Sequence, residues 1–60
     1  MMNASEAHAA LLKRGYSTGQ ADLAVTRAGM PGGYKLSRHK VTLDLSEPPG
    51  ADYRIEPLPW

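Results

Sequence analysis

The 60-residue chain contains no cysteine. This absence excludes a disulfide framework, which is the usual support of chains too short to bury a large core. It also removes thiolate metal ligands, and His8 and His39, the two histidines, do not make a metal-binding pattern without cysteine. We therefore expect no metal and no cofactor, in a small domain that relies on good packing, on a homodimer contact or on a partner.

Long apolar runs are also missing. No stretch approaches the roughly 20 apolar residues that cross a bilayer, and residues 1–15 lack the basic leader and apolar segment of a signal peptide. These absences predict a cytoplasmic protein with no membrane partner. At this length, residues 1–60 form a single small domain that buries roughly 60% of its unfolded surface.

Catalytic motifs are absent as well. The chain has serine, histidine and aspartate but no nucleophile elbow that would position them. The segment GMPGGYKLS, residues 29–37, superficially resembles a phosphate-binding loop, yet it lacks the adjacent Gly-Lys-Ser/Thr and follows no predicted strand. We therefore expect a protein that is not an enzyme.

Charge is distributed unevenly along the chain. The net charge is only +1, but residues 1–42 carry six lysines or arginines against two acidic residues, a net charge of +4. Residues 43–60 carry one arginine against four acidic residues, a net charge of −3. The sequence thus has a basic first part and an acidic tail, and each could recognise a partner of opposite charge.

Two helices are predicted in the first half. Asn3 and Glu6 have the spacing of a reciprocal capping box, and Gly15 is a typical residue beyond a helix end, so we expect a helix over 4–14. Ser17 and Gln20 repeat the pattern, with Gly29 beyond the end, and predict a helix over 18–28. The apolar positions at helical spacing are Ala4, Ala7, His8, Leu11 and Leu12 in the first helix and Ala21, Ala24, Val25 and Ala28 in the second. His8 is expected to pack rather than to act in catalysis.

The small side chains of these helices bury too little area to pack alone at about 25 cal/mol per Å², so the helices need a sheet. Alternating apolar residues predict a hairpin of 40–45 with 52–57, in which Leu45 lies opposite Tyr53 and Leu43 opposite Ile55. Pro57 and Pro59 favour an edge position for the last strand.

Upstream of this hairpin, Tyr34 and Leu36 alternate out of phase with Val41 and Leu43, which predicts a bend, bulge or tight turn near 37–39. The expected fold class is α+β: two antiparallel helices followed by a two- or three-stranded antiparallel β-meander.

Two segments resemble DNA-binding domains. YSTGQADLA, residues 16–24, resembles the first helix of the helix-turn-helix in MerR and excisionase-type winged-helix domains, and PGGYKLSR, residues 31–38, resembles the glycine-hinged wing. The resemblance implies that Ser17 and Thr18 touch phosphate at a helix N-terminus and that Tyr34, Lys35 and Arg38 act as wing contacts. The recognition helix of these families is missing or displaced here, because only VTRAGM remains before Pro31 and two glycines.

A second resemblance covers the same stretch. RGYSTGQADLAVTRAG, residues 14–29, is similar to the first loop and second helix of ubiquitin-associated domains, whose third helix is absent here. Both resemblances also arise from the plain requirements of a helical hairpin, namely Gly-aromatic after one helix and Ser-x-x-Gln before the next.

The main functional candidate is a basic cluster. It comprises Lys35, Arg38, His39 and Lys40 with Tyr34 beside it, and cations next to an aromatic ring bind phosphates and stack on bases. The leading hypothesis is a small DNA-associated regulatory or accessory protein, such as a phage protein that takes part in transcription regulation. A basic strand also protects a sheet edge from aggregation, and Ser17 and Thr18 also serve as ordinary helix caps.

The alternative hypothesis is a protein-binding module or inhibitor of the phage or mobile-element type. It would act through the hairpin edge and the acidic tail, with Tyr53 and Trp60 as aromatic anchors of a protein–protein interaction.

Overall fold

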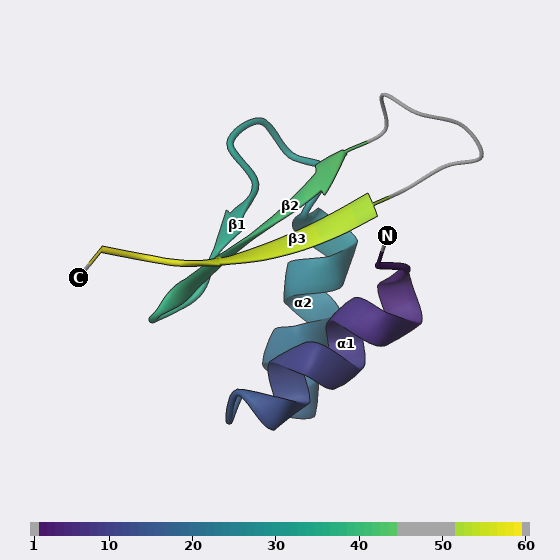
Figure 1. Cartoon of the computed structure of the whole chain (residues 1–60), viewed down its shortest axis with the longest axis vertical. Helices are drawn as coiled ribbons and strands as arrows, with labels where there is room; N and C mark the ends of the chain where they lie inside the picture. The colour runs from purple at the N-terminus through teal and green to yellow at the C-terminus, as the bar shows by residue number, and fades with distance from the viewer. Residues whose placement is uncertain (1, 45–51, 60) are drawn as a thin grey trace.

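The computed structural model describes residues 2–44 and 52–59. Two helices, α1 (Ala4–Lys13) and α2 (Thr18–Arg27), run antiparallel and are followed by three strands, β1 (Tyr34–Lys35), β2 (His39–Asp44) and β3 (Asp52–Pro57). The strands form one antiparallel sheet in the order β1-β2-β3. Both helices cover the same side of the sheet, with α1 against β3 and α2 against β1 (Figure 1). The predicted α+β class is confirmed.

Both predicted helix starts are confirmed at atomic detail. The Asn3 side chain accepts from the Glu6 amide at 2.8 Å, and the Glu6 carboxylate accepts from the Asn3 amide at 2.9 Å. Ser17 and Gln20 make the same exchange at 3.2 and 3.1 Å. Each exchange satisfies backbone donors that the first helical turn leaves unpaired, which explains why the helices begin where they do.

The predicted break near 37–39 is a tight turn between two strands. The Leu36 amide donates to the His39 carbonyl at 2.7 Å, and Tyr34 and Val41 lie directly opposite one another. Residues of opposite parity therefore face the same side of the sheet, because they lie on separate paired strands. This turn makes the sheet three-stranded.

The register predicted for β2 and β3 is wrong by two residues. Tyr53 lies opposite Leu43, not Leu45, and Ile55 lies opposite Val41, not Leu43. Leu45 itself is outside the described residues. A shift of two preserves which face each side chain takes, so apolar alternation cannot detect it. Contacts outside the hairpin accompany the observed register: the Tyr53 amide donates to the Met2 carbonyl and the Leu58 amide to the Arg38 carbonyl, both at 2.9 Å.

The core is small and lies between the helices and the sheet. Among the described residues, Leu11 and Val41 are the largest fully buried side chains. The other buried apolar residues are Ala7, Tyr16, Ala21, Ala24 and Ala28. Partly buried hydrophobic side chains pack against these residues, namely Val25, Tyr34, Leu36, Leu43, Tyr53 and Ile55. The buried residues of the helices are mainly alanines. The interior is therefore filled because the helices lie close to their neighbours, and not by large side chains.

Candidate functional site: a basic end of the molecule

The β1–β2 hairpin presents its lysines on the face that the helices do not cover. Val41 faces the core, so its neighbour Lys40 and the directly opposite Lys35 point to the outer face. Arg38 lies in the turn between the two strands and is exposed. The hairpin therefore carries three cations close to its tip.

Tyr16 fixes this hairpin tip to the helices. Its hydroxyl lies 2.6 Å from His39 Nδ1 and accepts from the Arg38 amide at 3.2 Å. The Tyr16 and His39 rings also meet edge to face, with centroids 5.6 Å apart and an interplanar angle of 83°. On the other side of the turn, the Leu58 amide donates to the Arg38 carbonyl. Both backbone polar groups of Arg38 are thus held by residues distant in sequence, while its side chain stays exposed.

The contact through Tyr16 brings a second basic segment to the same end. Lys13 ends α1, Arg14 caps it, and Gly15 separates Arg14 from Tyr16. An Arg14 guanidinium nitrogen donates to the Ala10 carbonyl at 3.0 Å. We call the set Lys13, Arg14, Lys35, Arg38 and Lys40 the basic end. Its members come from the end of α1 and from the β1–β2 hairpin, which are far apart in the sequence.

Acidic residues gather at the opposite end, near the N-terminus of α1 and the start of β3. Asp44 and Asp52 lie opposite one another, and the Met2 amide donates to Asp52 at 2.9 Å. Arg54 lies 3.9 Å from an Asp44 oxygen and 3.8 Å from an Asp52 oxygen. These exposed pairs contribute little to stability, but they partly neutralise the acidic end.

The sheet also mixes the charges that the sequence keeps apart. Lys40 of the basic part lies opposite Glu56 of the acidic tail, and Arg54 lies opposite Thr42. The outer face of the sheet is therefore not uniformly basic. Among the described residues, the cations at the tip of the β1–β2 hairpin and at the neighbouring α1–α2 turn outnumber the acidic residues there.

The structure separates the predicted site residues into three groups. Lys35, Arg38 and Lys40 share the hairpin tip, and Ser17 and Thr18 lie at the adjacent start of α2, where Ser17 acts as the cap. Tyr34 and His39 instead face the helices: Tyr34 is half-buried against the core, and His39 contacts Tyr16. Tyr53 also packs against the core at the far end of the sheet, and Trp60 lies outside the described residues.

His8 is half-buried and its Nε2 lies 3.0 Å from an Asp22 oxygen, so it links α1 to α2. Among residues 2–44 and 52–59, no three His, Asp or Glu side chains gather as a metal site would require. Neither described helix is long and apolar enough to cross a membrane.

Tyr16 is the structural residue that sequence reasoning missed. Its position after Gly15 is explained by the helical hairpin alone, and no local signal connects it with a turn more than 20 residues away.

Replacement of Tyr16 with phenylalanine keeps the ring in the core and removes only the hydroxyl. We expect Tyr16→Phe to lower the free energy of unfolding by about 1 kcal/mol, the usual net contribution of such hydrogen bonds.

Urea unfolding checks this expectation, with Tyr34→Phe as the matched control. The Tyr34 hydroxyl has no hydrogen-bond partner among the residues that the structure describes, so its removal should change stability by less than about 0.5 kcal/mol. Equal effects of the two substitutions would mean that the Tyr16 hydroxyl does not hold the hairpin tip.

No family model matches this chain, and no curated protein or solved structure matches it either.

Proposed function

We propose that this protein is a small, non-enzymatic DNA-associated accessory or regulatory protein that contacts phosphates through its basic end. The observation that carries the proposal is the Tyr16 hydrogen bonding, because it ties the α1–α2 turn to the tip of the β1–β2 hairpin, and both segments carry cations. Lysine and arginine that neutralise phosphates release counterions, and this release supplies most non-specific affinity for DNA. The acidic residues at the opposite end favour binding in one orientation.

The same surface argues against base readout. A recognition helix would have to follow α2, but in the described part of the chain α2 ends at Arg27 and the next element is β1. Phosphate contacts position a protein on the duplex without reading its sequence. We therefore propose that the protein binds DNA independently of the DNA sequence. The winged-helix resemblance is then limited to the start of α2 and the β1–β2 hairpin.

The test is a fluorescence titration with mixed-sequence duplexes over a range of salt concentrations. Alanine at Lys35, Arg38 and Lys40 together should flatten the slope of log affinity against log salt by about 0.9 for each phosphate that is no longer neutralised. Unrelated duplexes should bind within a few-fold of one another, and all should be weakened about equally.

Arg27→Ala is the matched control, because it removes one exposed cation at the other end of α2. It should leave the salt slope nearly unchanged. Tyr16→Phe should weaken binding a few-fold with no change of charge, since it loosens the join between the two turns. Binding weaker than about 10⁻⁴ M even at about 50 mM salt would be poorer than ordinary non-specific association and would refute the proposal.

A further inference from the structure

Few backbone N–H and C=O groups at the open edge of β3 are available to pair with a further strand. The Tyr53 amide donates to Met2, away from β2, so the alternate residues Ile55 and Pro57 also direct their backbone groups outward. Pro57 has no amide hydrogen, and Met2 already occupies the edge at Tyr53. Ile55 is therefore the residue of β3 with both an outward N–H and an outward C=O available for a further strand, and no described residue bonds either group.

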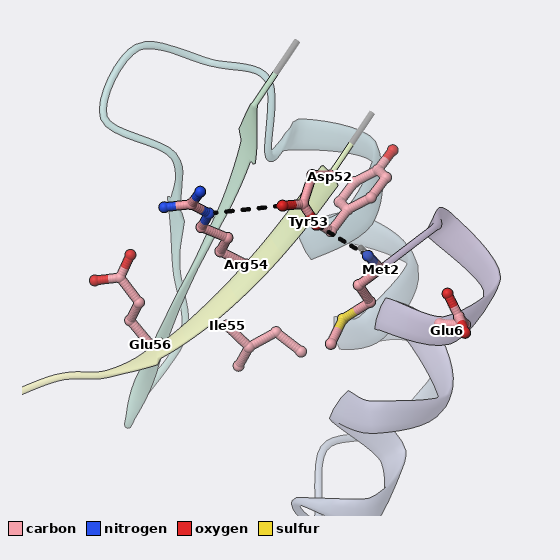
Figure 2. Close-up of a pocket in the computed structure, with 7 residues that line it drawn as sticks. All are labelled: Met2, Glu6, Asp52, Tyr53, Arg54, Ile55 and Glu56. Carbon is pink, nitrogen blue, oxygen red and sulfur yellow. Dashed lines mark hydrogen bonds and ion pairs between the residues drawn. The ribbon is translucent and has the colours of Figure 1, made fainter. Parts of the chain in front are cut away.

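A hollow of about 620 Å³ adjoins this edge, lined by Met2, Glu6 and residues 52–56. Figure 2 shows Ile55 and Met2 pointing into the space between β3 and α1, whereas Arg54 and Glu56 point to the other side of the strand. A strand added here would place alternate side chains on these two sides. An apolar side chain opposite Ile55 would enter the hollow, and charged neighbours would meet Arg54 and Glu56.

We propose that this edge docks an extended peptide segment of another protein, antiparallel to β3, with the order basic, apolar, acidic, and that this segment ends or turns away after its acidic residue. In that direction the basic residue lies opposite Glu56, the apolar residue opposite Ile55, and the acidic residue opposite Arg54. Opposite charges directly across a strand pair are favourable and like charges are unfavourable. Main-chain bonds give such a site its affinity, and the alternate side chains give it selectivity.

The segment from Arg54 to Glu56 itself has the order basic, apolar, acidic, so a second copy of the chain is the competing occupant. Two-fold pairing about Ile55 would place Pro57 of the second copy opposite Tyr53. That position is taken by Met2, whose carbonyl accepts the Tyr53 amide. A peptide that ends at its acidic residue avoids this collision.

The probe is the peptide acetyl-Thr-Val-Lys-Val-Glu-amide, titrated into ¹⁵N-labelled full-length protein. Amide shifts should change at residues 54–56 and Met2, and affinity should exceed that of acetyl-Thr-Val-Glu-Val-Lys-amide by about fivefold. A probe N-methylated at the valine opposite Ile55 should bind more weakly, because it cannot donate to the Ile55 carbonyl.

Glu56→Lys should reverse the preference between the two peptides, provided that its amide spectrum shows a folded chain. Asp22→Asn, an exposed carboxylate removed on α2, should leave the preference unchanged. Equal binding of both peptides, no binding at millimolar probe, or shifts confined to the helices would overturn the proposal. Shifts at residues 54–56 that depend on protein concentration without peptide would overturn it in favour of the second copy.

Discussion

Gly33→Ala is expected to lower the free energy of unfolding by about 3 kcal/mol or more. Gly33 has a φ of +76°, which costs a residue with a Cβ about 1–2 kcal/mol. An added Cβ would also lie 2.6 Å from the Val41 carbonyl oxygen and 2.6 Å from Thr42 Cγ2. The threonine methyl can rotate, but the Val41 carbonyl belongs to the strand that carries the buried core residue, and such overpacking costs another 1–3 kcal/mol or so.

Gly32→Ala separates these two costs. Gly32 has nearly the same backbone angle, φ +81°, but an added Cβ there meets nothing within 4 Å. This control should show only the backbone cost, and the difference between the variants measured by urea unfolding should report the collision at Val41. Equal destabilisation would mean that the start of β1 shifts to accommodate the methyl group. For a domain of this size, whose total stability is about 3–9 kcal/mol, Gly33→Ala removes a large fraction of the whole.

The helices were predictable because their signals are local. The capping residues lie three positions apart, and Asn3 with Glu6 and Ser17 with Gln20 satisfy backbone donors in any context that permits a helix. Helix ends were predicted one residue too long, since α1 ends at Lys13 and α2 at Arg27. Terminal turns commonly vary at this scale.

The sheet was predictable only in part. Alternation placed Val41, Leu43, Tyr53 and Ile55 on one face, which the structure confirms. It could not choose between registers that differ by two residues, because both put the same side chains in the core. The contacts that accompany the observed register involve Met2 and Leu58, which lie outside the hairpin pattern.

The basic end was the least predictable feature. Clustering along the sequence identified Lys35, Arg38 and Lys40, but it also included Tyr34 and His39, whose side chains face the helices. Lys13 and Arg14 lie beside the segment that Tyr16 ties to the hairpin, far from Lys35 in the sequence. A surface assembled by a hydrogen bond between residues 22 positions apart in sequence leaves no local pattern from which it could be inferred.

The core is the second place where a single substitution should have a large effect, and adjacent leucines provide the comparison. Leu11, a residue of α1, is fully buried in the core, whereas its neighbour Leu12 is 41% exposed. Leu11→Ala should lower the free energy of unfolding by about 2–5 kcal/mol, because the truncated side chain leaves a cavity lined by small alanines that cannot expand to fill it. Leu12→Ala should change it by less than about 1 kcal/mol.

The Leu11 substitution also tests how the core supports the basic end. The Leu11 carbonyl accepts from the Tyr16 amide at 3.2 Å, and both side chains belong to the buried cluster. Denaturant unfolding should therefore give Leu11→Ala a much lower free energy of unfolding than Leu12→Ala. The NMR signals of the Tyr16 and His39 rings should broaden or shift in Leu11→Ala. If both leucine variants unfold at the same denaturant concentration, the burial of Leu11 does not stabilise the packing of α1.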